Sequence, residues 1–83
     1  KLNLAEESWD DYLYWQEADK RIVKKINELI KDTRRTPFEG KGKPEPLKHN
    51  LSGFWSRRIT EEHLLVYAVT DDSLLIAACR YHY

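Results

Sequence analysis

The sequence predicts an α+β fold in which an antiparallel β-sheet carries an N-terminal helical hairpin packed on one face. In the first part of the chain, apolar residues recur at helical spacing. In the last part, apolar runs rich in Val, Leu, Ile and Tyr alternate with short acidic breaks, which is typical of antiparallel strands joined by hairpins. An irregular segment that contains all three prolines separates the two parts.

The length of 83 residues predicts a single domain spanning residues 1–83. One cysteine, Cys79, excludes a disulfide within the chain and fits a reducing, cytoplasmic environment. No apolar run approaches the roughly 20 residues of a membrane span, so we expect no membrane contact. The formal net charge is zero, but residues 20–60 carry twelve basic and four acidic residues, so this middle part can attract a polyanion.

The N-terminal half predicts a short strand followed by two helices. Residues 1–5 form the expected strand, and Glu6 begins the first helix, with Ser8 and Asp11 in a loose capping-box pattern. Its expected apolar face comprises Trp9, Tyr12, Leu13 and Trp15. Asp19 is a favourable N-cap for a second helix over residues 20–33. The apolar stripe of that helix comprises Ile22, Val23, Ile26, Leu29 and Ile30.

The C-terminal half predicts a loop and a three-stranded meander. Residues 36–48 form a thirteen-residue irregular loop, which in so small a domain is more often functional than not. Residues 47–51 are expected to add a short edge strand. The meander strands are expected at residues 54–59, 63–69 and 73–81. With the helical hairpin on one side, the opposite face of the sheet is left open for a ligand.

The faces of the meander depend on its register. If residues 61–62 and 71–72 are two-residue loops, Ile59 faces Leu64 and Val69 faces Leu74. One face then holds Arg58, Leu65, Tyr67, Ile76, Arg80 and His82, and the other holds Arg57, Leu64, Val66, Cys79, Tyr81 and Tyr83. A single bulge would exchange the two sets.

Several side chains are of the types that a phosphodiester-handling site requires. Arginine binds phosphate oxygens in a bidentate manner, histidine and glutamate can transfer protons near neutral pH, and tyrosine stacks on unpaired bases. The candidates are Glu45, Lys48, Arg57, Arg58, Arg80, His82 and Tyr83. By composition alone the signal is weak, because adjacent arginines in a strand are more often surface residues and a C-terminal histidine is more often simply solvated.

A metal site has less support. Cys79 and His82, with His49 or His63, are the conceivable ligands, but no CxxC or HxxxH spacing accompanies them. We therefore expect no metal and no cofactor, and a core position for Cys79.

A resemblance to a known family covers nearly the whole chain, from EESWDDYLYWQ in the first helix through residues 19–63 to LVYAVTDDSLLIAACRYHY at the end. GKPEPLK, GFWSRRI and the closing CRYHY are its sharpest parts, and EESWDDYLYWQ extends it to the first helix. These segments resemble the YoeB family of the RelE-like superfamily of toxin–antitoxin messenger-RNA endoribonucleases. The resemblance implies a small α/β toxin that cleaves messenger RNA in the ribosomal A site without a metal. It also implies a neutralising antitoxin of YefM type as partner and leaves a homodimer open.

The resemblance assigns roles to individual residues. It implies that Glu45 is the general base for the ribose 2′-hydroxyl and that His82 and Tyr83 lie by the scissile phosphate, with His82 the general acid. Lys48 and Arg58 would hold phosphate charge, with Arg57 beside them.

The chain departs from the family pattern at one position that matters for catalysis. Where the family has an arginine in E-E-H-R-L-V-Y, this chain has Leu64, which can neither donate a hydrogen bond nor carry charge. Asn3, Leu4, Ala5 and Ala18 also differ. The sequence therefore predicts an endoribonuclease with strongly reduced activity, or else a catalytically inactive protein that binds antitoxin or ribosome. A ParE-type gyrase inhibitor is disfavoured because Glu45 accompanies His82 and Tyr83.

Overall fold

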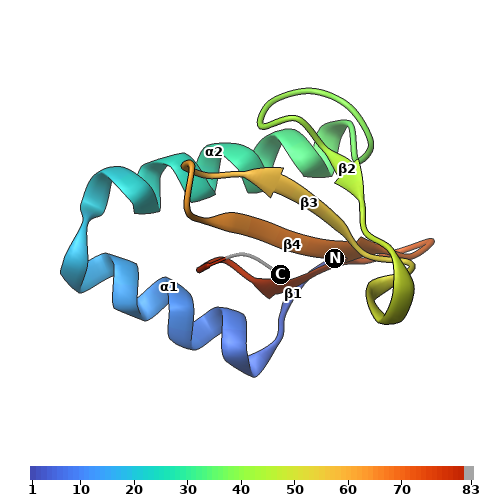
Figure 1. Ribbon diagram of the computed structural model, residues 1–83. Coiled ribbons are helices and arrows are strands. Elements are labelled where there is room, and N and C mark those ends of the chain that lie inside the picture. Colours follow the sequence, from blue (N-terminus) through green and yellow to red (C-terminus); the bar gives the residue numbers. More distant parts are fainter. Residues whose placement is uncertain (82–83) are drawn as a thin grey trace.

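Two helices lie against one face of a five-stranded sheet in the computed structural model, which describes residues 1–81 (Figure 1). The helices are α1 (Glu6–Ala18) and α2 (Lys20–Arg35), and a short 3-10 helix, η1, spans His49–Leu51. The strands are β1 (Leu2–Leu4), β2 (Glu45–Pro46), β3 (Trp55–Arg58), β4 (Leu64–Val69) and β5 (Leu74–Ala78). The predicted fold class is confirmed. Among the described residues, no helix is both long and apolar enough to cross a membrane.

The strands follow the order β1-β5-β4-β3-β2 across the sheet. Strands β3, β4 and β5 form the predicted meander, and β2 pairs antiparallel with β3 at one edge. The N-terminal strand β1 pairs parallel with β5 at the other edge, so the sheet is mostly rather than entirely antiparallel. This pairing follows from the chain path, because α1 and α2 carry the chain back across the sheet before the meander begins.

The predicted edge strand at residues 47–51 is wrong in position. The edge strand is β2, at Glu45–Pro46, and residues 49–51 form η1 instead. Pro46 has no N–H to donate, which is tolerated at a sheet edge, and the Leu47 N–H continues the pairing with a 2.8 Å bond to the carbonyl of Phe54. Glu45 is thereby fixed to the sheet rather than left in a free loop.

The predicted face of α1 is also partly wrong. Ser8 and Trp15 are its buried residues, while Trp9 is 49% and Leu13 39% exposed. The hydroxyl of Ser8 lies 2.8 Å from the carbonyl oxygen of Ile76 in β5 and 2.9 Å from that of Ala5. Because this small, satisfied polar residue lets the helix approach β5 closely, the helix is rotated away from the expected aromatic face. Ser8 therefore does not serve as the predicted cap, and Ala5 occupies the N-cap position.

Helix α2 supplies more of the apolar core than α1 does. Asp19 accepts a hydrogen bond from the backbone N–H of Arg21, which confirms it as the N-cap. Ile26 and Leu29 are fully buried, and Ile22 and Ile30 are half-buried at the margin of the same cluster. From the sheet, the cluster receives Leu65, Tyr67, Leu74 and Ile76, together with Cys79 beyond β5.

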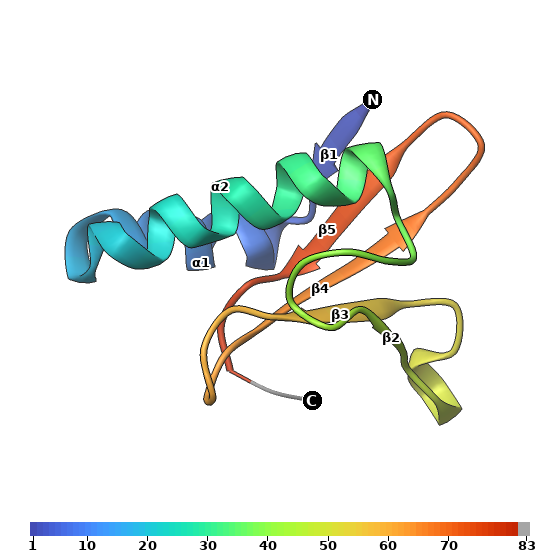
Figure 2. The same cartoon turned by 90° about the horizontal axis from the view of Figure 1, so that it is seen from above.

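A buried arginine connects the helix, the sheet and the loop between them. Arg57 of β3 is fully buried, and its Nη1 lies 2.7 Å from Oδ2 of Asp32 in α2. The same guanidinium donates to the carbonyl oxygens of Thr36, Glu39 and Lys41, at 2.6, 2.9 and 3.1 Å. Its Nε donates to the Tyr67 hydroxyl at 3.2 Å, and that hydroxyl donates to the carbonyl of Pro37 at 2.7 Å. These bonds hold the segment that leads from α2 to β2, which Figure 2 shows crossing from the end of α2 to the edge of the sheet.

Asp32 receives further bonds that stabilise its charge. Arg35 donates to Oδ1 at 2.8 Å and the backbone N–H of Lys41 donates to Oδ2 at 2.9 Å. Together with Arg57, these donors hold the pKa of the Asp32 carboxyl well below its ordinary value of 3.8. Gly40 lies against this carboxylate with a φ of +116°, where any side chain would meet the carboxylate oxygen.

We predict that Arg57→Met destabilises the fold far more than Arg58→Met. The first change removes the charged partner of a buried carboxylate and the donors to several loop carbonyls, which costs about 3–5 kcal/mol for a broken buried pair. The neighbouring Arg58 is exposed, so its replacement should change the free energy of unfolding by about 0.5 kcal/mol or less. Urea denaturation of both variants measures the difference, and equal losses would show that the guanidinium network contributes little.

We also predict that part of the acid sensitivity of the fold comes from Asp32. The unfolded chain binds a proton near the ordinary pKa of aspartate, whereas the folded chain binds it only at lower pH. The stabilisation is therefore complete above about pH 5 and is lost as the pH falls further. Asp32→Asn should weaken the decrease in unfolding free energy between about pH 5 and pH 3, and Asp71→Asn, in the exposed β4–β5 turn, is the matched control. An unchanged pH dependence in Asp32→Asn would contradict this assignment.

Candidate functional site

Strand pairing places three of the predicted site residues on the sheet face opposite the helices. Arg58 pairs with Leu64, and two residues earlier Ser56 pairs with both Val66 and Glu45. Directly paired residues share a face, as do residues two apart along a strand. Glu45, Arg58 and Leu64 therefore lie on one face, contributed by β2, β3 and β4. Glu45 and Arg58 are exposed and Leu64 is half-buried.

The predicted register of the meander is wrong by one residue at the β3–β4 hairpin. Leu64 pairs with Arg58 instead of Ile59, because the turn is longer than two residues and Ile59 instead donates its N–H to the carbonyl of His63. The predicted pairing of Val69 with Leu74 is confirmed, and a bulge at Val66 and Tyr67 separates the two registers. The shift exchanges the two arginines between faces, so that Arg58 joins Leu64.

Arg57 is on the helix-facing side with Leu65 and Tyr67, and its guanidinium is fully occupied by Asp32, Tyr67 and loop carbonyls. It has no exposed surface with which to contact an RNA phosphate. The expectation that Arg57 binds RNA is therefore wrong, and its charge serves the fold.

Lys48 lies just beyond β2, on the same edge of the sheet as Glu45. It is exposed and precedes η1, whose residue Leu51 donates its N–H to the Lys48 carbonyl at 3.1 Å. Lys48 follows β2 in the chain, and Arg58 lies in the neighbouring strand β3, so both place positive charge near the short strand β2. No hydrogen bond or ion pair joins the side chains of these three described residues, Lys48, Arg58 and Glu45, so the structure places them in one region without linking them.

The end of the chain approaches the same region at Leu64. The backbone N–H of Leu64 donates to the carbonyl of Tyr81 at 3.0 Å, and the N–H of Tyr81 donates to Nδ1 of His63 at 2.8 Å. His82 and Tyr83 follow directly in the sequence and lie outside the described residues. Leu64 is thus bonded to the last described residue before the predicted acid, His82.

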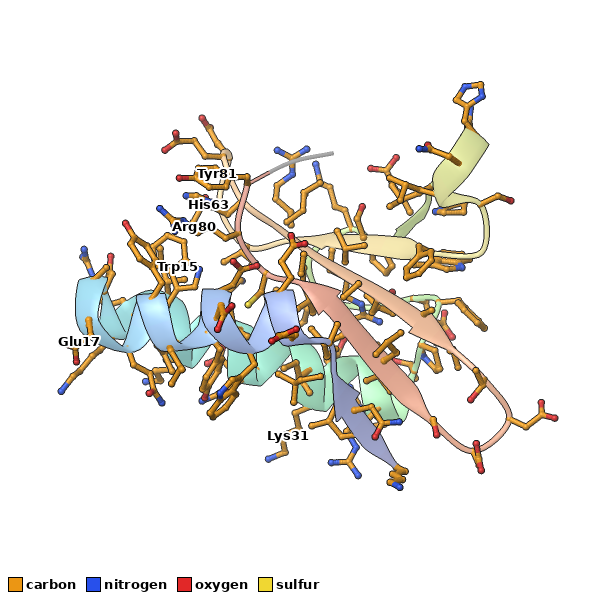
Figure 3. All side chains as sticks on the ribbon, turned by 90° about the horizontal axis from the view of Figure 1, so that it is seen from below. Trp15, Glu17, Lys31, His63, Arg80 and Tyr81 are labelled. Carbon is orange, nitrogen blue, oxygen red and sulfur yellow. The ribbon has the colours of Figure 1, made fainter. Side chains whose placement is uncertain are left out.

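Of the residues that hold this chain end, Arg80 was a predicted candidate for the phosphodiester site, whereas Trp15, His63 and Tyr81 were not. Trp15, His63, Arg80 and Tyr81 gather where the chain leaves β5 beside α1 (Figure 3). The guanidinium carbon of Arg80 lies 3.5 Å from the ring centroid of Tyr14 and 4.6 Å from that of Tyr81. The prediction that Arg80 and Arg58 share a face of the sheet is wrong. Arg80 lies beyond the end of β5, where its guanidinium packs on the rings of Tyr14 and Tyr81. The aromatic residues of α1 were the sequence feature that could have indicated this contact with the chain end, but their helical spacing predicted only packing in the core.

Cys79 is buried as predicted. Burial, followed by the charge of Asp11, raises the pKa of its thiol to about 12, so the thiol is neutral and unreactive near neutral pH. Within residues 1–81, no cluster of three or more His, Cys, Asp or Glu side chains has the arrangement of a metal site.

A groove of about 1010 Å³ lies away from these residues. It is formed by β1 and the two helices, and its lining includes Leu2, Leu4, Trp9, Tyr12 and Ile30, with Lys31 and Arg34 at its border. The exposed Trp9 belongs to this groove. None of the predicted catalytic or RNA-binding residues that the structure describes contributes to it, so the groove is distinct from the face that carries Glu45, Arg58 and Leu64.

Comparison with known sequences connects the whole chain to one group of proteins. A family model described as the YoeB-like toxin of bacterial type II toxin–antitoxin system matches residues 4–83. Toxin YoeB of Escherichia coli K12 is 94% identical over 83 residues, which are 100% of this chain and 99% of the relative. Toxin YoeB of a Synechocystis species is 59% identical and covers 100% of this chain and 96% of its own length.

Solved structures agree with the sequence comparison. A YoeB/ParE toxin from Agrobacterium tumefaciens has a TM-score of 0.97 at 54% identity, covering 100% of this chain and 99% of its own. A YoeB dimer from Staphylococcus aureus has a TM-score of 0.93 at 51% identity, covering 100% and 97%. A heterotetrameric YoeB–YefM toxin–antitoxin complex from the same organism has a TM-score of 0.92 at 51% identity, with the same coverage. Since both the family model and close relatives span the chain, it belongs to the YoeB-like toxins of bacterial type II toxin–antitoxin systems.

Proposed function

We propose that this chain is a ribosome-dependent messenger-RNA endoribonuclease that cuts in the A site by metal-independent acid–base catalysis, at a rate strongly reduced by Leu64. The observation that carries the proposal is the shared sheet face of Glu45, Arg58 and position 64, with Tyr81 bonded to Leu64 beside it. A carboxylate and a cation on one exposed surface, next to the end of a chain closing in a histidine and a tyrosine, suit phosphodiester chemistry.

The proposed reaction needs one base and one acid. Glu45 removes the proton of the ribose 2′-hydroxyl, and the 2′-oxygen forms a bond to phosphorus while the bond from phosphorus to the 5′-oxygen breaks. His82 gives its proton to that leaving oxygen, so the products are a 2′,3′-cyclic phosphate and a 5′-hydroxyl. Arg58 and Lys48 neutralise phosphate charge, and Tyr83 lies by the scissile phosphate.

Leu64 removes a donor where negative charge increases in the transition state. Its side chain is beside Arg58 on the proposed catalytic face and can neither bind nor neutralise a phosphate oxygen. Loss of one preorganised donor commonly reduces kcat by on the order of 10²–10³. This same residue supports the second candidate function, a catalytically inactive protein that still binds antitoxin or ribosome.

The proposed partners are a YefM-type antitoxin, the ribosome and messenger RNA, and the proposed location is the cytoplasm. The Staphylococcus aureus relative was crystallised with YefM and also as a dimer, which supports antitoxin binding and self-association as proposals for this chain. An antitoxin segment that covers Arg58 and Lys48 would neutralise the toxin by blocking the access of RNA.

We predict that Leu64→Arg increases single-turnover cleavage of ribosome-bound messenger RNA by about a hundredfold or more. A guanidinium at position 64 acts mainly on kcat, because phosphate charge is greater in the transition state than in the ground state. The same change should leave the fold no more stable, since it places an arginine directly opposite Arg58. Rates within a factor of a few of each other would show that position 64 is not catalytic and would favour the binding function.

We predict that Glu45→Gln abolishes most of the cleavage regained by Leu64→Arg. Glutamine keeps the size of the side chain but cannot accept the 2′-hydroxyl proton, and a general base contributes typically 10²–10⁴-fold. Glu39→Gln, in the preceding loop, is the matched control. Glu39 is exposed and binds Arg57 through its backbone carbonyl, so the same change of side chain should leave the fold and the cleavage rate unchanged. Undiminished cleavage by the double variant Glu45→Gln, Leu64→Arg would exclude Glu45 as the base.

A further inference from the structure

Beyond the end of β5, the chain is held by several side chains and by one backbone bond from β4. The segment Cys79–Tyr81, here called the terminal strap, follows the last strand residue, Ala78. The N–H of Cys79 donates to Oδ2 of Asp11 at 3.0 Å, and its carbonyl accepts from Nε1 of Trp15 at 2.9 Å. Both partners belong to α1, so this helix fixes the start of the terminal strap.

His63 fixes the other end of the terminal strap. Its Nδ1 accepts the N–H of Tyr81 at 2.8 Å, and its ring packs edge-on against Trp15 with the centroids 4.8 Å apart. The ring also lies against that of Tyr81, at 5.5 Å. In this bond Nδ1 is the acceptor, so only a side chain with an acceptor atom at the same place can make it.

Tyr81 has a backbone conformation that needs such support. Its φ is +66°, in the left-handed region that residues other than glycine rarely adopt. The N–H of Tyr81 donates to the His63 side chain, and its carbonyl accepts from the N–H of Leu64. Two adjacent residues of the β3–β4 hairpin therefore bind both of its backbone polar groups. Loss of one bond would free Tyr81 to return to a more favourable backbone conformation.

We propose that His63 is a positioning residue for the reaction: its Nδ1 holds Tyr81 in the left-handed conformation, against the backbone of Leu64 at the proposed catalytic face. The inference rests on the proposed function, because it assigns catalytic importance to that conformation. His63 contacts neither substrate nor the reacting atoms in this role, and it acts through the backbone of Tyr81. The β3–β4 hairpin thus contributes to the site both at position 64 and through the preceding residue.

The test compares His63→Asn with His63→Leu in the Leu64→Arg protein. The two replacements have nearly the same size, and both remove the ring, but asparagine Oδ1 can take the place of Nδ1 as acceptor while leucine cannot. Amide hydrogen exchange at residue 81 should be faster in His63→Leu than in His63→Asn. The rate of single-turnover cleavage at saturating ribosome should fall on the order of a hundredfold in His63→Leu, as for a small misplacement of a catalytic group. The ribosome concentration that gives half of the maximal rate should be nearly unchanged. His63→Asn should restore most of that rate.

Three outcomes would overturn the inference. One is unchanged exchange at residue 81 in His63→Leu, which would show that the acceptor does not hold the strap. Another is faster exchange with undiminished cleavage, which would show that the strap does not position the site. The third is an equal loss of cleavage in both variants, which would indicate that ring packing on Trp15 matters and the acceptor does not. If the Leu64→Arg parent itself fails to cleave, the proposed function fails, while hydrogen exchange still tests whether His63 holds Tyr81.

Discussion

The ion pair of Arg57 and Asp32 is the interaction on which the arrangement of the site depends. It joins β3 to α2, and the remaining donors of the guanidinium bind carbonyl oxygens of the segment that leads to β2. A buried guanidinium is costly unless each N–H has an acceptor, so the loop must take a path that presents its carbonyls to Arg57. That path ends at β2, and it therefore determines where Glu45 joins the sheet.

Adjacent residues of β3 have opposite functions because a strand alternates its side chains between faces. Arg57 faces the helices and stabilises the core, whereas Arg58 is exposed beside Glu45 and Leu64 on the other face. The fold and the proposed chemistry thus draw on different faces of the same three strands. A change on the open face can alter reactivity while the Arg57 network and the apolar cluster below it remain intact.

The parts of the fold that follow from local pattern could be predicted from the sequence. The stripe of α2, the N-cap Asp19 and the strands of the meander depend on periodicity and on turn residues that are visible in the chain. The roles of Arg57 and Ser8 could not be predicted, because they depend on partners 25 and 68 residues away. The faces of Arg57 and Arg58 depended on one residue of register at the β3–β4 turn, which no local pattern fixes. The resemblance identified Glu45 and Arg58, but it gave no reason to single out His63 or Trp15.

Position 64 shows how backbone and side chain can contribute separately to one site. Its N–H binds the carbonyl of Tyr81, and any residue except proline can make that bond. Its side chain is beside Arg58, where the choice between leucine and arginine determines the charge on the proposed catalytic face. A leucine here avoids charge repulsion with Arg58, suits a half-buried strand position and offers the proposed catalytic face no charged donor. Similarity of fold to the YoeB relatives is therefore expected whether or not this chain cleaves RNA, because the features that hold the terminal strap do not include the side chain of residue 64.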